Sequence, residues 1–208
     1  MRFLPFLLLL LLAGCGGGSG TSAPENPDLT LDATKWIFAY SHGMPDHPTQ
    51  LPRGWSFDFP PQDGVHYVLT GSDLSGGASI VVTATVTMTP GAVFDWNRDG
   101  NTCPTPAAAH LMIQRRGDDM VDEYGRWWAS VPIPLIPGTL TIAVPLTADA
   151  WTDVYGRSGA DNPESFRVAL ASGGNVGLTF GGGCFYGHGV HVSGGNATFA
   201  LSLFEVNQ

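Results

Sequence analysis

The sequence is dominated by short runs of β-branched and apolar residues that alternate in type along the chain. The clearest run is SIVVTATVTMT, in which every second side chain would point to the same side of a strand. The residues expected on that side are Ile80, Val82, Ala84, Val86 and Met88. Alternation with a period of two is typical of a strand with one buried face. The chain is therefore constrained to fold mainly from strands that pair and bury one side.

Runs of this kind recur along the chain from residue 29 onward, and no long segment has a helical period. The predicted strands are Thr34–Tyr40, Trp55–Phe59, Gly64–Thr70, Ala78–Thr89, Ala92–Trp96, Ala109–Arg116, Arg126–Ile133, Thr139–Leu146, Asn175–Phe180, Gly189–Val192 and Asn196–Val206. Successive strands with turn residues between them favour antiparallel pairing in two packed layers. We therefore expect an all-β fold, an antiparallel β-sandwich, in a single domain over residues 29–208.

One segment departs from this pattern and predicts a short helix. Asn162 can cap the first turn, and Pro163 suits the first helical position. Phe166, Ala169 and Leu170 would then fall on one side, and the glycine pair after them would end the helix.

Composition limits the classes of function. The chain has 208 residues, of which 43% are hydrophobic, so it can bury a core of one domain. Nine Lys and Arg stand against eighteen Asp and Glu, which gives a formal net charge of -9. Nucleic acids and anionic lipid surfaces attract basic proteins. The charge balance therefore argues against a nucleic-acid partner.

The N-terminus carries a targeting pattern. Met1-Arg2 precedes the apolar run Phe3–Leu12, which is shorter than the roughly 20 residues that a spanning helix needs. The run ends in Leu-Ala-Gly-Cys15, which resembles the lipobox of bacterial lipoproteins. The resemblance implies a signal peptide over residues 1–14, cleavage before Cys15, and a diacylglycerol on its sulfur. Two or three acyl chains give stable attachment without spanning the membrane.

The lipobox resemblance also bears on location. Residues 15–28 are rich in Gly, Ser and Pro and are typical of a flexible linker after the acylated cysteine. Gly16 stands where many lipoproteins retained at the inner membrane carry Asp. We therefore expect a lipid-anchored protein of the bacterial cell envelope, at the outer membrane or cell surface rather than the inner membrane.

Two further sets of residues are candidates for structural sites. Cys103 and Cys184 remain after Cys15 is used, and an oxidising compartment favours a disulfide between them, with two separate buried thiols as the alternative. Asp95, Asn97 and Asp99 precede Gly100 with the spacing of the first half of a calcium loop. The bidentate Glu of such a loop is missing, and an ordinary turn uses the same residue types. The sequence thus predicts no cofactor other than a structural calcium ion at this loop, and an ordinary turn is the alternative.

The second half of the sandwich resembles a known group of domains. The order of a strand with Trp127-Trp128, the strand GTLTIAVPL, Trp151, the short helix, NVGLTF and the closing NATFALSLFEV is similar to that in jelly-roll carbohydrate-binding and galactose-binding-like modules. The resemblance covers under half the chain and lies in the pattern of elements. It implies a jelly-roll-like sandwich and a sugar as ligand, although one fold hosts many functions.

The densest concentration of polar and aromatic residues is the candidate ligand site. It comprises Arg116, Asp118, Arg126, Trp127 and Trp128. Sugars are held by aromatic faces and by Arg or carboxylate groups. Neighbouring residues of a strand point to opposite faces, so we expect one Trp in the core and the other exposed as a platform. The alternative is that the whole stretch is core with a salt bridge.

These observations favour a non-catalytic binding module with carbohydrate as its ligand. The alternative is a structural or accessory envelope lipoprotein that binds another protein. No nucleophile elbow, zinc-binding helix or triad spacing occurs in the sequence, so an enzyme is not expected.

Overall fold

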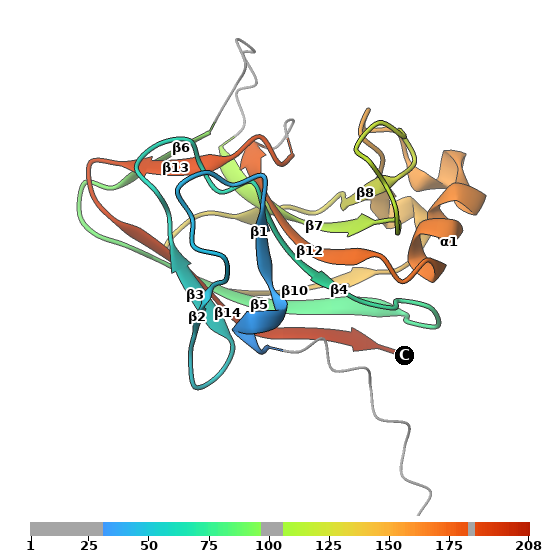
Figure 1. The fold of residues 1–208 in the computed structure, drawn as a ribbon, viewed down its shortest axis with the longest axis horizontal. Helices are drawn as coiled ribbons and strands as arrows, with labels where there is room; N and C mark the ends of the chain where they lie inside the picture. The colour runs from blue at the N-terminus through green and yellow to red at the C-terminus, as the bar shows by residue number, and fades with distance from the viewer. Residues whose placement is uncertain (1–30, 97–105, 183–185) are drawn as a thin grey trace, which may run out of the picture.

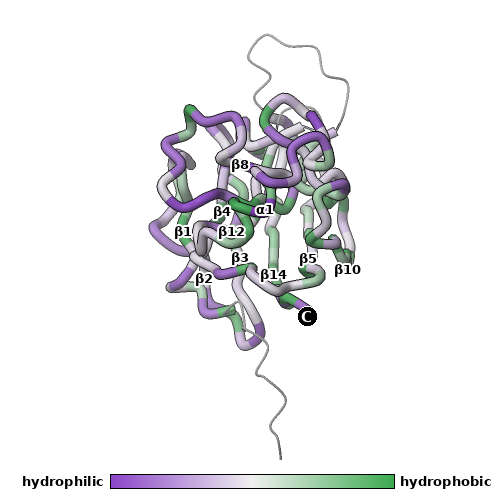
Figure 2. The backbone as a smooth tube through the Cα atoms, turned by 90° about the vertical axis from the view of Figure 1, so that its right-hand side faces the viewer, coloured by the Kyte–Doolittle hydropathy of each residue, from purple (hydrophilic) through white to green (hydrophobic). Residues whose placement is uncertain are grey.

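The computed structural model describes residues 31–96, 106–182 and 186–208. Over these ranges the chain is an antiparallel β-sandwich with one short α-helix, which confirms the predicted all-β class (Figure 1). Figure 2 shows the two layers, with β4 (Tyr67–Gly71) and β12 (Asn175–Gly182) on one side and β5 (Ser79–Met88) and β10 (Gly138–Pro145) on the other. The arrangement is compatible with a jelly roll.

The larger sheet has seven strands. Its order is β1 (Ile37–Ala39), β4, β12, β7 (Ala107–Gln114), β8 (Arg126–Ala129) and β11 (Trp151–Thr152), and β9 (Ile133–Pro134) also pairs with β7. Every pairing in it is antiparallel. The central strand β12 thus pairs on both sides with strands from distant parts of the sequence, β4 and β7.

The smaller sheet has five strands, in the order β10, β5, β14 (Ala197–Asn207), β3 (Trp55–Asp58) and β2 (Thr49–Gln50). β5 has the alternation that the sequence predicts, because Ile80, Val82, Ala84 and Val86 are buried while the residues between them are half-buried. A separate two-stranded antiparallel sheet pairs β6 (Val93–Trp96) with β13 (Val190–Ser193).

Aromatic rings join the two sheets. Phe180 of β12 packs edge-on against Phe57 of β3, with ring centroids 5.5 Å apart, and against Phe199 of β14 at 5.4 Å. Trp36 packs in the same core against Trp55 at 4.9 Å and Phe204 at 5.1 Å. Aromatic side chains bury large apolar areas and prefer such edge-to-face contacts. The interface between the sheets is therefore the main core.

Four details differ from the predicted strands. The segment Ala33–Lys35 is a 3-10 helix, η1, because Asp32 accepts a bond from the Thr34 amide and caps a turn. The predicted strand Arg126–Ile133 is broken between β8 and β9, where Pro132 supplies no amide for a ladder bond. The two-residue strands β2 and β11 are too short to leave a periodic pattern.

The predicted helix is confirmed as α1 (Pro163–Ala171), and Gly173 follows it in the left-handed region at φ 60°. The capping prediction is wrong, because the Asn162 side chain makes no capping bond at its backbone angles of φ −139° and ψ 59°. Phe166 of α1 packs against Trp127 and Trp151, so the helix covers one end of the core.

The helices that the structure describes are all short. Within the described ranges, no helix has the length and hydrophobicity needed to cross a bilayer.

The close packing of β12 on β4 predicts that a side chain at Gly177 lowers stability. A Cβ added to Gly177 would collide with the carbonyl oxygen of Val68 on β4 and lie 2.9 Å from Leu69 Cα. Because both neighbours are backbone, we expect Gly177→Ala to lower the free energy of unfolding by about 1–3 kcal/mol. Gly71→Ala is the control, since nothing lies within 4 Å of its added Cβ. Urea denaturation of both variants tests this, and equal stability of the two would contradict it.

Candidate functional site

The central strands of the seven-stranded sheet are buried on both faces. All eight residues of β7 and all four of β8 are buried. Leu111 and Ile113 face the other sheet and belong to the main core, whereas His110 and Met112 alternate with them and face outward. A strand buried on both sides requires something to cover its second face.

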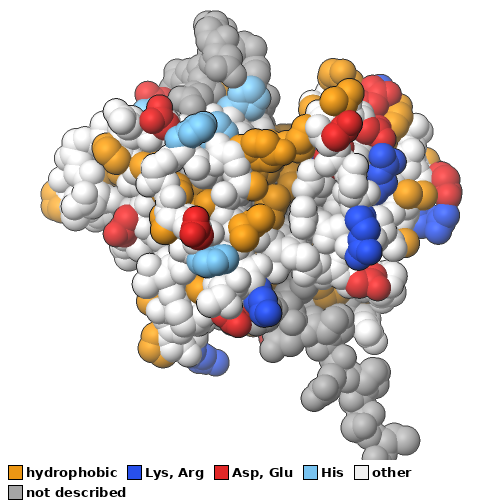
Figure 3. Space-filling model, viewed as in Figure 1, with side chains coloured by type: hydrophobic (Ala, Val, Ile, Leu, Met, Phe, Trp, Pro, Cys, Tyr) orange, Lys and Arg blue, Asp and Glu red, His pale blue; other side chains and the backbone are white. Residues whose placement is uncertain are grey.

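The outward side holds a second, smaller hydrophobic cluster. Tyr67, Leu69, Met112 and Trp128 form this outer-face cluster, drawn from β4, β7 and β8. Ala39, Met120 and Tyr186 pack against it from neighbouring segments. Figure 3, seen from this side, shows hydrophobic side chains gathered in a hollow, with charged side chains concentrated toward the side of α1.

Aromatic rings define the edges of this hollow. Tyr40, which is 61% exposed, packs edge-on against Tyr67 with centroids 5.6 Å apart. The half-buried Tyr186 lies 4.1 Å from the His110 ring and 5.9 Å from the Trp128 ring. Burial raises the pKa of the Tyr67 phenol, which therefore stays protonated at neutral pH. The site thus presents several aromatic rings, and that of Tyr67 carries no phenolate charge.

His110 has a defined tautomer in this environment. Its Nδ1 lies 3.0 Å from the carbonyl oxygen of Ala129, and a carbonyl accepts, so Nδ1 carries the proton. Burial lowers the pKa of the imidazole below its ordinary value, so the ring is neutral at neutral pH. Nε2 is therefore a lone-pair acceptor.

Apart from Arg126 Nε, which lies in ion-pair contact with Asp118, three buried polar atoms on this face have no hydrogen-bond partner among the described parts of the chain. They are His110 Nε2, Trp128 Nε1 and Thr179 Oγ1. Thr179 is directly opposite His110 in the β12–β7 pairing, and Trp128 is opposite Met112, the next outward residue of β7. Leaving such groups unpaired costs about 1–3 kcal/mol each. These three atoms are therefore buried groups that remain able to form a hydrogen bond.

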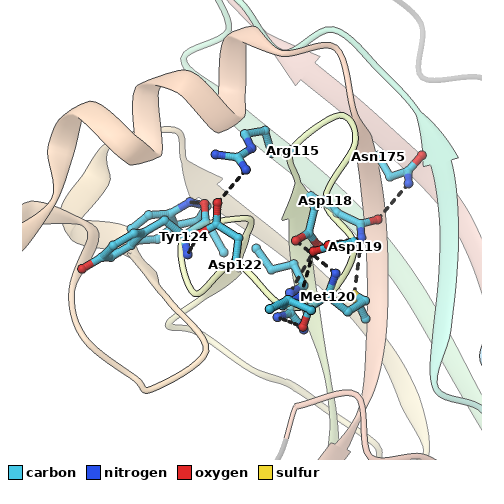
Figure 4. A network of polar contacts seen from close by, with 11 residues as sticks. Arg115, Asp118, Asp119, Met120, Asp122, Tyr124 and Asn175 are labelled. Carbon is cyan, nitrogen blue, oxygen red and sulfur yellow. Dashed lines mark hydrogen bonds and ion pairs between the residues drawn. The ribbon is translucent and has the colours of Figure 1, made fainter.

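A polar network holds the loop that covers part of the cluster. Arg126 Nε lies 3.3 Å from Asp118 Oδ2, and both side chains are buried. Gln114 donates to the same carboxylate at 3.0 Å, and Arg126 also donates to the Met120 carbonyl at 2.8 Å (Figure 4). These bonds fold the loop so that Met120 packs on the outer-face cluster.

The predicted tryptophan platform needs correction. Trp127 is 0% exposed and lies in the main core, where its indole donates to the Tyr124 carbonyl. Trp128 points to the other face as expected, but it is 2% exposed because Tyr186 and the Met120 loop cover it. Neither ring is an exposed platform.

The remaining predicted ligand residues divide into two places. The structure brings Asp118 and Arg126 to the outer face beside Trp128, with the Arg126 guanidinium 5.9 Å from the Trp128 ring centre. Arg116 lies apart from them and donates to the Gly173 carbonyl after α1. Asp118 and Arg126 form an ion pair with each other, so neither presents an unpaired charge to a ligand. Their role is to hold the loop that forms one side of the hollow.

The other predicted sites fall largely outside the described residues. Cys15, Cys103 and Cys184 lie there, and so do Asn97 and Asp99 of the calcium prediction. Asp95 is the last residue before Trp96 at the end of β6, and its carboxylate accepts from the Trp96 amide at 2.8 Å. Where the structure describes the chain, it contains no group of three His, Cys, Asp or Glu arranged to hold a metal. The lipid, disulfide and calcium predictions remain predictions.

Sequence reasoning missed His110, Thr179, Tyr40, Tyr67 and Tyr186. The available signal was a polar residue at alternate positions in otherwise apolar strands, as in AAAHLMIQ and NVGLTF. Such residues are usually solvent-exposed on one face. Here they are buried because loops cover the face, and the sequence pattern of a strand does not reveal that cover.

Comparison with known proteins gives no family assignment. No protein-family model matches the chain, and no curated protein matches its sequence.

Burial of His110 predicts a pH-dependent contribution to stability. The unfolded imidazole titrates near pH ~6.5, whereas the folded one takes up a proton only at lower pH. Between these values the unfolded state binds more protons, so the free energy of unfolding falls as pH drops below about 6.5, by at most about 1.4 kcal/mol per pH unit. Denaturation at pH 8, 6 and 5 measures this.

The control is His110→Gln, which keeps a donor for Ala129 but does not titrate. Other histidines and carboxylates titrate in both proteins and cancel in the difference. Parallel stability curves for the two proteins would contradict the assignment to His110.

Proposed function

We propose that the protein is a lipid-anchored, non-catalytic binding module of the bacterial cell envelope, and that its ligand is a carbohydrate. The observation that carries the ligand class is the hollow on the outer face of the seven-stranded sheet. It combines aromatic rings with buried polar atoms that lack partners. Sugars need both, since their CH faces pack on rings and their hydroxyls hydrogen-bond.

Two features of the sequence support the same proposal. The pattern of residues 126–206 resembles that of jelly-roll carbohydrate-binding modules, and the chain has a two-sheet architecture compatible with them. The Leu-Ala-Gly-Cys15 segment supports an acyl anchor at the outer membrane or cell surface. An anchored module of this kind would hold a glycan next to the membrane.

An apolar slot favours the alternative, an accessory lipoprotein that binds another protein. A cavity of about 120 Å³ lies beside β9 and β10, lined by Ile133, Ile136 and Leu140 among others. Ile136 is 63% exposed there, and an exposed apolar side chain beside a slot suits a protein partner.

A glycan-array screen of the domain from residue 24 onward tests the proposed ligand class. We expect binding that Tyr40→Ala weakens by about 1–2 kcal/mol, because the exposed ring at the edge of the hollow would be lost. Tyr155→Ala is the control: Tyr155 is 70% exposed but packs on Arg157. Absence of any glycan signal would leave the protein-partner alternative as the better account.

The anchor has its own test. Cys15→Ser removes the sulfur that would carry the diacylglycerol, so the protein should lose all metabolic labelling by palmitate and remain an uncleaved precursor. Cys103→Ser is the matched control, and it should be labelled like the unchanged protein. Labelling of Cys15→Ser at the normal level would show that the lipobox interpretation is wrong.

A further inference from the structure

The three unpartnered atoms on the outer face belong to neighbouring side chains of β7, β8 and β12. His110 and Thr179 are cross-strand neighbours, whose Cβ atoms are typically about 4.5–5.5 Å apart. Trp128 lies one row further along the same face, and the Tyr186 ring touches both His110 and Trp128. All three side chains are at most 2% exposed, so their polar atoms are not satisfied by bulk solvent.

Two of the three atoms have a fixed hydrogen-bonding role. His110 Nε2 accepts, because the proton of the neutral ring is on Nδ1 and is donated to the Ala129 carbonyl. Trp128 Nε1 can only donate. The Thr179 hydroxyl can do either. A group that satisfies His110 and Trp128 together must donate and accept at once.

A hydroxyl meets this requirement, whereas a carboxylate and an ammonium do not. A carboxylate has no proton to give to His110 Nε2, and an ammonium has no lone pair to accept from Trp128. Arg126 adds no free charge that would favour an anion, since Asp118 pairs with it on the same face.

We propose that this site takes a hydroxyl of a neutral sugar, which donates to His110 Nε2 and accepts from Trp128 Nε1 and from the Thr179 hydroxyl. The inference rests on the proposed carbohydrate function and names the group that is recognised. The Tyr186 side chain covers His110 and Trp128 in this structure, so its ring turns aside when the hydroxyl enters. Side-chain rotations of this kind are common on binding.

The first experiment uses NMR on the full acylated chain in detergent micelles. The probes are the neutral methyl glycosides of glucose, galactose and mannose, together with the matching uronic acids. We expect a neutral glycoside, and not its uronic acid, to shift the Trp128 indole resonance and the His110 Nε2 resonance. The Trp127 indole is an internal control, because it donates to Tyr124 in the main core and should not shift.

The second experiment is Thr179→Val, which removes the hydroxyl and keeps the shape. Since Thr179 Oγ1 has no partner within the described residues, we expect an equal or higher melting temperature. Affinity for the glycoside should fall about three- to tenfold, which corresponds to one lost hydrogen bond. Thr83→Val is the matched control, because Thr83 pairs with Thr141 on the outer side of the other sheet and should not change affinity.

The outcomes separate this inference from the proposed function. Glycoside binding that Tyr40→Ala weakens, with no shift at Trp128 and full affinity in Thr179→Val, overturns the hydroxyl site and keeps the carbohydrate function. A lower melting temperature of Thr179→Val with unchanged affinity means that a buried water already satisfies these atoms, and it also overturns the site. No binding by any glycoside overturns both.

Discussion

The structure depends on the burial of β7, β8 and β12 on both faces. One face is closed by the aromatic contacts of Phe180 and its neighbours with the other sheet. Among the described residues, no second sheet packs on the other face, and side chains from loops cover it. Backbone bonds within the sheet do not fix those loops, so their positions depend on side-chain interactions.

The Asp118–Arg126 network supplies the side-chain interactions that fix one of these loops, and it also shapes the hollow. The carboxylate is held by Arg126 and Gln114, and Gln114 is held in turn by Asn175 of β12. Gly125 leaves room for the carboxylate, since an added Cβ would meet Asp118. Two of the residues that the sequence predicted to bind a sugar, Asp118 and Arg126, thus build the wall of the hollow, while histidine, threonine and tyrosine side chains provide its polar and aromatic lining.

The contrast between strands and hollow shows what a sequence can predict here. The alternation in β5 and the Pro163 start of α1 are local patterns, and the fold contains both. The exposure of Trp128 depends on Tyr186 and Met120, which reach it from other parts of the chain. Alternation assigned Trp127 and Trp128 to opposite faces correctly, but it carries no information on which faces are covered.

The buried ion pair has a consequence for how this loop can change over generations. Losing Asp118 alone would leave the Arg126 guanidinium in the interior without its carboxylate, and losing Arg126 alone would do the reverse. Replacing both by apolar residues removes the two charges together and avoids that penalty. The two positions are therefore coupled: once one of the two charged residues has been replaced, replacing the other by an apolar residue restores stability.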